Sequence, residues 1–315
     1  MLSRVANSLY WMCRYIERAE NIARFIDVNL NLLLDLPYDE NEQWGPLVVT
    51  TGDNKLFENS YGEPDKDKVI NFLTFDNNYH NSIISTLEKA RENARSVREI
   101  ISSEMWEQIN KYYFFVKDAS NLLEDHDNLY DFYYRIKLES HLFTGTMDTT
   151  MSHGEGWHFG RMGRLLERAD KTSRILDVKY YILLPSVDLI GSPIDYIQWA
   201  ALLKSASALE MYRKRFRRIL PDKVADFLIM DSEFPRAIRY CLIHSQRSLR
   251  TITGTSFGTY KNAAERYLGK LSSELDYSQT DEIITVGLHE FLGRFQHDLN
   301  VVGNSIHETF FEVGK

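Results

Sequence analysis

Two long stretches of this 315-residue chain contain no proline. All seven prolines lie outside residues 65–184 and 236–315. Proline is excluded from helix interiors and also from central strands, so its absence alone does not choose between them. The two stretches are rich in Leu, Ala, Glu, Lys and Arg, which favour helices, and they lack the Asn-Gly and Asp-Gly dipeptides of tight hairpins. The sequence therefore predicts an all-α protein.

The expected helices can be placed along the chain. A long first helix is predicted over residues 3–35, because Ser3 is a suitable N-cap and Pro37 follows its end. Residues 36–67 hold three prolines and are expected to be mostly loop, with a short helix near 44–50. Further helices are expected over 68–110 (with a break near 76–78), 111–151, 155–184, 198–218, 222–229, 235–252, 259–273 and 280–312.

Charge and cysteine content exclude several classes of protein. The net charge of −8 disfavours a dedicated nucleic-acid binder, which needs cations to displace the counterions of phosphates. Two cysteines, Cys13 and Cys241, cannot build a zinc framework or a disulfide scaffold. No apolar run approaches the roughly 18 residues that span a bilayer, and the N-terminus does not resemble a signal peptide. We expect a cytoplasmic protein that binds neither nucleic acid nor membranes.

The most specific feature of the sequence is an internal repeat. Residues 14–28, Arg-Tyr-Ile-Glu-Arg-Ala-Glu-Asn-Ile-Ala-Arg-Phe-Ile-Asp-Val, return 150 residues later as residues 164–178, with seven of fifteen positions identical. After a shift of five residues the match continues at an offset of 155, which pairs Trp44 with Trp199. Ordered matches at a nearly constant offset indicate two copies of one helical unit.

The repeat predicts how the chain is organised. One unit is expected to cover residues 1–151 and the other residues 152–315. Such copies usually pack about a pseudo-two-fold axis and share a core, because a single unit often cannot bury its apolar face alone. We therefore expect a helical bundle built from two repeated units in one compact body.

Each copy of the repeat helix carries a stripe of polar and charged residues. At about 100° per residue these side chains fall on one face, opposite the apolar residues. The stripe of the first copy consists of Arg14, Glu17, Arg18, Asn21 and Arg24. That of the second copy consists of Arg164, Glu167, Arg168, Lys171 and Arg174.

The stripe has two interpretations, a solvated face with weak ion pairs or a buried or cleft-lining Arg/Glu network. A solvated face tolerates exchange of Arg for Lys and of Glu for Gln, so two copies should diverge there first. Instead the Arg and Glu positions are identical, whereas apolar Ile22 and Ala23 correspond to Thr172 and Ser173. A planar guanidinium pairs with a carboxylate in a fixed bidentate geometry, which favours the network. Its role stays open between a structural link and a site for an anionic ligand.

Six segments carry longer motifs, at residues 2–21, 90–95, 103–106, 155–157, 163–170 and 198–203. They span nearly the whole chain and resemble the signature of the bacterial alpha-E domain family. The resemblance implies an all-helical fold with characteristic glutamates. It also implies genes beside a circularly permuted ATP-grasp ligase and a transglutaminase-like cysteine peptidase, and hence partners in peptide synthesis or amide ligation.

The resemblance also marks the positions at which we expect a ligand to bind. Asp170 stands where the first copy has Glu20, which keeps the charge but shortens the reach. The marked positions are Arg4, Arg14, Glu17, Arg18, Glu20, Arg91, Glu92, Asn93, Arg95, Arg164, Glu167, Arg168 and Asp170.

Motifs for familiar cofactor and metal chemistry are absent from the sequence. There is no phosphate-binding loop, dinucleotide fingerprint or His-Glu-x-x-His sequence, and no pair of Glu-x-x-His helices. The closest cluster, at residues 153–158, fits a polar helix start better than a metal site. We expect no cofactor and no metal.

Two functions from different classes are consistent with these residues. The first is a non-catalytic partner of the ATP-grasp ligase, whose Arg/Glu face binds a carboxylate-bearing peptide or the ligase itself. The second is an enzyme that uses Glu17, Glu167 or Glu104 as a general acid or base beside Arg clamps. A carboxylate base needs a raised pKa and therefore burial. We favour the first function, because no nucleophile or metal motif is recognised.

Overall fold

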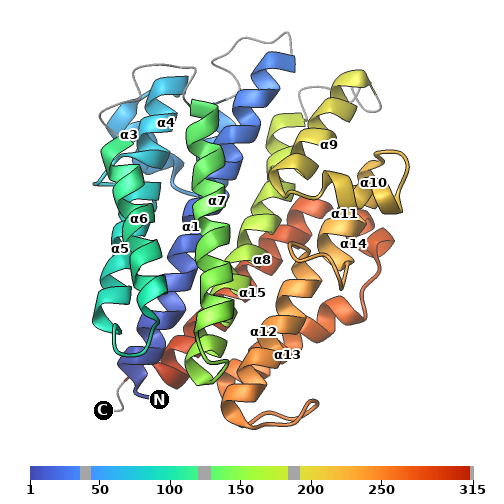
Figure 1. Ribbon diagram of the computed structural model, residues 1–315. Helices are drawn as coiled ribbons and strands as arrows, with labels where there is room; N and C mark the ends of the chain where they lie inside the picture. The colour runs from blue at the N-terminus through green and yellow to red at the C-terminus, as the bar shows by residue number, and fades with distance from the viewer. Residues whose placement is uncertain (36–43, 120–128, 184–191, 313–315) are drawn as a thin grey trace.

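In the described part of the chain all regular secondary structure is α-helical, and there is no β-strand (Figure 1). The computed structural model describes residues 1–35, 44–119, 129–183 and 192–312. The predicted all-α class is confirmed.

Fifteen helices make up these ranges. The first seven are α1 (Ser3–Asp35), α2 (Gly45–Thr51), α3 (Asn54–Tyr61), α4 (Lys66–Thr74), α5 (Ile83–Ser96), α6 (Ser103–Ala119) and α7 (Leu129–Thr150). The remaining eight are α8 (Glu155–Leu183), α9 (Pro193–Ser205), α10 (Leu209–Arg215), α11 (Pro221–Met230), α12 (Ile238–Thr253), α13 (Ala263–Asp276), α14 (Thr280–Val286) and α15 (Leu288–Phe310).

The two long helices α1 and α8 match their predicted bounds closely, but other expectations need correction. Helix α3 lies inside a segment that we expected to be loop. The helix expected over 198–218 is broken between α9 and α10, where Ser207 has a φ of 48°. The helix expected over 280–312 is broken at Gly287, whose φ of 111° ends α14 and begins α15.

Eight of the helices form two groups of four, and the α1–α8 pair joins the groups (Figure 1). Helix α1 packs against α5 and α7, and α6 bridges these two. Helix α8 packs against α12 and α15, and α13 bridges these two. The two groups therefore follow the same order along the chain, with a long helix first and three shorter helices after it.

Each group surrounds its own apolar core. One core is built from residues 5–147 together with Trp157, and the other from residues 159–311 together with Ala6 and Tyr10. The central helices thus contribute across the boundary in both directions. The turn between α7 and α8 contains the predicted boundary at 151/152.

Small residues bring α1 and α8 into close contact. A Cβ atom placed on Gly163 would lie 2.4 Å from the Tyr10 carbonyl oxygen, and one on Gly160 would lie 2.9 Å from Cys13 Sγ. Such separations are sterically forbidden, so α8 can approach α1 this closely only with glycine at these positions. The charged stripes of the two helices are consequently held at side-chain contact distance.

Within the described ranges, no helix is both long and apolar enough to cross a membrane.

Replacing Gly163 with Ala tests this close approach. The added methyl group must displace the Tyr10 carbonyl, and we expect a loss of about 1–3 kcal/mol in unfolding free energy despite the better helix propensity of alanine. Gly145 on α7 is the matched control, since a Cβ there meets nothing within 4 Å. Gly145→Ala should raise stability by about 0.5–1 kcal/mol. Urea denaturation measures both, and an unaltered or higher midpoint for Gly163→Ala would contradict the close packing.

Candidate functional site

Two reciprocal ion pairs join α1 to α8. Arg18 of α1 donates from Nε and Nη2 to the two carboxylate oxygens of Glu167, at 2.7 and 3.1 Å. Arg168 of α8 donates from Nε and Nη2 to the two oxygens of Glu17, at 2.8 and 2.7 Å. Each Glu-Arg dipeptide thus binds the Glu-Arg dipeptide of the other helix in bidentate fashion.

Both glutamates are buried and accept further hydrogen bonds. Glu167 is 1% exposed and also accepts from Arg14 Nε at 2.8 Å. Glu17 is equally buried and accepts from Asn21 Nδ2 at 3.0 Å. Arg236, in the turn before α12, adds a contact of 3.2 Å from Nη1 to Glu17 Oε1.

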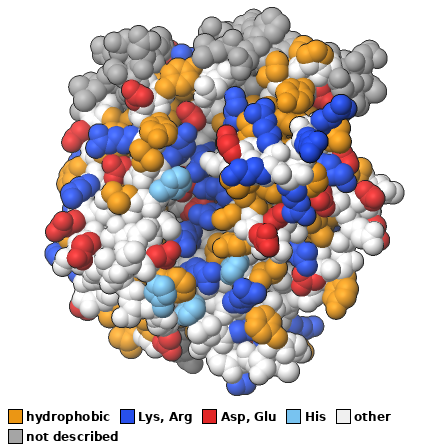
Figure 2. Space-filling model, turned by 45° about the vertical axis from the view of Figure 1, so that its right-hand side comes forward, with side chains coloured by type: hydrophobic (Ala, Val, Ile, Leu, Met, Phe, Trp, Pro, Cys, Tyr) orange, Lys and Arg blue, Asp and Glu red, His pale blue; other side chains and the backbone are white. Residues whose placement is uncertain are grey.

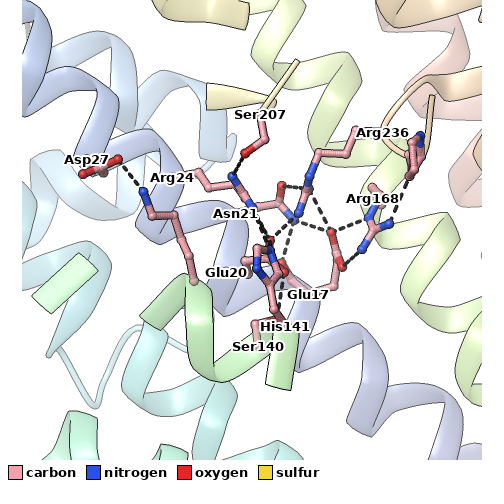
Figure 3. Close-up of polar contacts among 12 residues, drawn as sticks. Glu17, Glu20, Asn21, Arg24, Asp27, Ser140, His141, Arg168, Ser207 and Arg236 are labelled. Carbon is pink, nitrogen blue, oxygen red and sulfur yellow. Dashed lines mark hydrogen bonds and ion pairs between the residues drawn. The ribbon is translucent and has the colours of Figure 1, made fainter. Parts of the chain in front are cut away.

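A third buried carboxylate, Glu20, binds groups from three segments (Figure 3). Arg24 Nε and Nη2 donate to Glu20 Oε1 at 2.9 and 2.6 Å, and Arg236 donates to the same oxygen. From α7, Ser140 Oγ donates at 2.7 Å and His141 Nε2 lies 3.2 Å away. Glu20 therefore links α1, α7 and the turn before α12.

The corresponding carboxylate on α8, Asp170, has fewer partners. Lys171 Nζ lies 2.9 Å from Asp170 Oδ2 and 3.6 Å from Glu167 Oε1. Arg174 Nε donates to Asp170 at 3.0 Å, and its Nη1 donates to the Thr50 carbonyl at 3.2 Å. This side of the network extends towards α2.

A cavity of about 520 Å³ opens beside this second side of the network. It lies among α1, α8, α15 and the segments around residues 50–51 and 79–81. Its volume falls within the usual range for small-molecule sites, roughly 300–1,000 Å³. The charged side chains that line it are Arg14, Arg18, Lys171, Arg174 and Asp170.

The described lining of the cavity carries a surplus of positive charge. Among the described residues, four cations line it and Asp170 is the one acidic lining residue, with Glu167 buried behind Arg14 and Arg18. Arg18 Nη1 is held by Asn81 Oδ1 at 2.6 Å, and the Arg14 guanidinium lies 4.7 Å from the Trp11 ring centre. These contacts fix the guanidinium groups before any ligand arrives. The arrangement can hold an anionic group.

The alpha-E family, described as a predicted alpha-helical domain with a conserved ER motif, matches residues 1–311. This chain belongs to the alpha-E family. Its Glu-Arg dipeptides at 17–18 and 167–168 are the ones that bind each other across α1 and α8. In this alpha-E chain, a Glu-Arg motif therefore forms the contact between the two central helices.

The chain is similar to longer, uncharacterized bacterial proteins. Uncharacterized proteins of Mycobacterium bovis and of two strains of Mycobacterium tuberculosis are 23% identical over 300 residues. The match covers 89% of this alpha-E chain but only 33% of each relative, so the chain spans about a third of their length. No solved structure gives a significant match.

The carboxylates of the alpha-E network are held in the ionised form. Burial raises the pKa of Glu17, but Arg168 and Arg236 outweigh it and bring that pKa below its ordinary value. Burial also raises the pKa of Glu167, but Arg18 and Arg14 lower it by more, so that this pKa lies well below the ordinary range. The enzyme hypothesis needs a raised pKa for a glutamate base, and these two glutamates show the opposite shift.

The remaining carboxylates follow the same rule. Burial raises the pKa of Glu20, but the opposing effects of Arg236 and Arg24 are larger. The pKa of Glu20 is therefore well below its ordinary value. At Asp170 the effect of burial is outweighed by Lys171 and Arg174, and the pKa falls to about 2.

Half of the predicted site residues meet in the network around the α1–α8 contact. Arg164 also lies on α8, but it does not join the network. Its Nε and Nη1 atoms are buried and have no hydrogen-bond partner within the described ranges. The residues brought together in the network are Arg14, Glu17, Arg18, Glu20, Glu167, Arg168 and Asp170.

The other predicted residues lie elsewhere on the molecule. Arg4 is exposed near the start of α1, and Glu104 is exposed in the first turn of α6. A surface group at α5 and α6 holds Arg91, which donates to Asn110 at 2.6 Å, and Arg95, which pairs with Glu92 at 2.7 Å. Asn93 lies on the same turn of α5 and is part-buried. None of these residues contacts the central carboxylates.

Sequence reasoning missed several contributors to the network, above all Arg236. A signal for Arg236 did exist, because the offset of 155 pairs it with Asn81, and both side chains contact the Glu-Arg pairs. Ser140 and His141 of α7 had no such signal, since nothing in a single sequence brings them near Glu20.

Removing one buried carboxylate charge should be costly. Glu167→Gln keeps the side-chain shape but leaves Arg14 and Arg18 without their counter-ion, and we expect a loss of about 3 kcal/mol in unfolding free energy. Glu104→Gln is the control, because that carboxylate is exposed and its loss should change stability by less than about 0.5 kcal/mol. Equal denaturation midpoints for the two variants would contradict the buried network.

The lowered pKa values also predict how stability depends on pH. The unfolded chain takes up protons near the ordinary Asp and Glu values of about 3.9 and 4.3, whereas the folded carboxylates stay ionised to lower pH. Stability is therefore complete above about pH 5 and falls as the pH drops towards the Asp170 pKa of about 2. Melting temperatures measured from pH 7 to pH 2 check this. The decline should be shallower for Glu167→Gln, and parallel curves would contradict the assignment.

Proposed function

We propose that this alpha-E protein is a non-catalytic component of an ATP-grasp-linked peptide-synthesis or amide-ligation system, and that its cavity binds a carboxylate-bearing ligand. The observation that carries the ligand assignment is the charge of the cavity, with four cations opposed by Asp170 on its surface. A small anion that enters gains charge-assisted hydrogen bonds from groups already fixed in position.

The rest of the lining suits a peptide. Asn300 and Asn304 present side-chain amides, which can exchange hydrogen bonds with a peptide backbone. Trp11 and Phe25 offer apolar surface beside them. A ligand with one carboxylate, one or two amide groups and an apolar portion would match all three kinds of wall. Inorganic anions alone would use only the cationic part.

The enzyme alternative is less well supported. The pKa values of Glu17 and Glu167 are lowered, so neither carboxylate is poised to take up a proton near neutral pH. Glu104 is exposed and does not line the cavity. We therefore retain binding rather than catalysis as the proposed role of the site.

We also propose that residues 1–151 and 152–315 are two copies of one helical unit, related by a pseudo-two-fold axis. The shared helix order and the reciprocal Glu-Arg contacts support this. On this view Asn81 and Arg236 occupy equivalent places. Arg236 reaches Glu17 and Glu20, whereas the shorter Asn81 leaves space at the cavity.

The proposed partners are the ATP-grasp ligase and the transglutaminase-like peptidase of the family resemblance, in the cytoplasm. The mycobacterial relatives support cooperation with other domains, because they are about three times as long as the matched region. A carboxylate-bearing ligand also suits amide ligation, because a ligase consumes a carboxylate when it forms an amide bond.

Calorimetric titration of this protein with the ATP-grasp ligase expected from the adjacent gene, and with the product of that ligase, tests the proposal. Asn81→Arg should fill the cavity, and Arg18→Lys should lose the bidentate fork while keeping the charge. We expect both variants to bind the product at least about tenfold more weakly, as for loss of a charge-assisted hydrogen bond. Arg95→Gln, on the separate surface of α5, is the control and should bind normally. Unchanged affinity in the first two variants would reject the cavity as the binding site.

A further inference from the structure

Arg164 on α8 differs from its counterpart in the sequence repeat. Arg14 donates from Nε to Glu167 at 2.8 Å, and its Nη2 lies 2.8 Å from the same carboxylate. Among the described residues, Arg164 has no such partner for its buried Nε and Nη1 atoms. The carboxylate expected for it, Glu17, is already bound by other guanidinium groups. Arg164 is left as a part-buried cation without a counter-ion.

The neighbouring polar groups do not supply that counter-ion. On α8, Arg161 lies one turn before Arg164, and its Nη2 lies 2.8 Å from His244 Nδ1 of α12. Ser245 and Ser248 of α12 are fully buried, and their hydroxyl groups lack hydrogen-bond partners within the described ranges. Helices α8 and α12 pack directly against each other, and the contact of Arg161 with His244 lies at this α8–α12 seam.

Burial and neighbouring cations lower the pKa values of the basic side chains along the seam. The pKa of His244 is lowered to about 4, first by burial and then by Arg161 and Arg247. Burial also lowers the pKa of Arg161, and Arg164 adds to that shift, against opposing effects of Tyr240 and Asp148.

The same holds at the adjoining turn of α8. Burial, Arg161 and His153 together lower the pKa of His158, whose Nδ1 atom is buried without a partner in the described part of the chain. Asp148 of α7 already accepts a hydrogen bond from Trp157 Nε1 at 3.1 Å. Positive charge therefore exceeds negative charge around Arg161.

Solvent reaches this region. Arg161, Arg164 and His244 are each partly exposed. Figure 2, which turns the right-hand side of Figure 1 forward, shows Lys and Arg side chains and histidines gathered along the middle of the face between the two helix groups. Neither Arg161 nor Arg164 lines the 520 Å³ cavity, so the two regions are separate.

We infer that a small oxyanion group, a carboxylate or a phosphate, binds at the α8–α12 seam beside Arg161 and Arg164. A part-buried guanidinium without a counter-ion is unfavourable, and Arg164 holds two buried N–H groups that have no partner among the described residues. An oxyanion accepts from guanidinium, hydroxyl and imidazole donors alike, which are the groups found here. This site goes beyond the proposed ligand of the cavity and does not depend on it.

Thermal unfolding of the full chain tests the inference, with inorganic phosphate and glutarate as probes and sodium chloride at matched ionic strength as the control. Either probe should raise the melting temperature of the wild type by about 2–4 °C near saturation, and chloride should not. A response to phosphate alone or to glutarate alone identifies the preferred group. Equal responses to both probes and to chloride would overturn the inference.

The variant Arg164→Met keeps the apolar stem and removes the charge. Without probe it should melt about 2 °C or more above the wild type, since an unpaired buried charge is lost, and it should no longer respond to the probe. Arg14→Met is the matched control and should melt lower, because Arg14 is bonded to Glu167. If Arg164→Met does not fold, Arg161→Gln at a partly exposed position replaces it.

The Asn81→Arg background separates this site from the cavity. There the cavity is filled, so a remaining response that is abolished by adding Arg164→Met belongs to the seam. A response lost in Asn81→Arg but kept in Arg164→Met would overturn the seam site while supporting the cavity. Nuclear magnetic resonance gives a local check, because an anion beside His244 should raise its pKa above about 4. An unchanged His244 titration at saturating probe would also overturn the inference.

Discussion

The structure depends on the reciprocal bidentate pairing of Glu17 with Arg168 and of Glu167 with Arg18. A buried carboxylate or guanidinium is unfavourable by itself, so each helix needs the other to satisfy its charges. Glycine at position 163 allows the backbones to approach closely enough for these contacts. The two four-helix groups then pack outward from this pair, each with its own apolar core.

The paired charges also determine which chemistry the site supports. Because the cations hold the glutamates ionised, these carboxylates serve as fixed counter-charges that orient guanidinium groups. Such a scaffold suits recognition of an anion more than proton transfer. The two sides of the network nevertheless differ, since Arg236 reaches Glu17 on one side, whereas on the other side Arg18 is bound by Asn81 at the cavity.

Periodicity and proline placement were sufficient to predict the all-α class and the bounds of α1 and α8, because these are local properties of the chain. Identity of Arg and Glu between the repeats was also sufficient to predict a buried network in place of a solvated stripe. Broken helices were missed where a positive φ, as at Gly287, interrupts a continuous helical pattern. The segments around Arg91 and Glu104 also resembled family motifs. A sequence motif does not show which residues lie close together in the fold, and these two residues lie away from the network. His141 meets Glu20 only through tertiary packing, which a single sequence does not encode locally.

The reciprocal pairing has a consequence for how such a chain could have arisen. Each Glu-Arg dipeptide contains both the acceptor and the donor of the contact, so the surface that carries it is complementary to a copy of itself. Two separate chains, each with one such helix, could have formed the same pair of bonds across an isologous dimer interface. Joining them in one polypeptide would have kept the contact and freed the two sides to diverge. The exchange of an amide for a guanidinium at positions 81 and 236 is the kind of asymmetry that a dimer of identical chains could not acquire on one side alone.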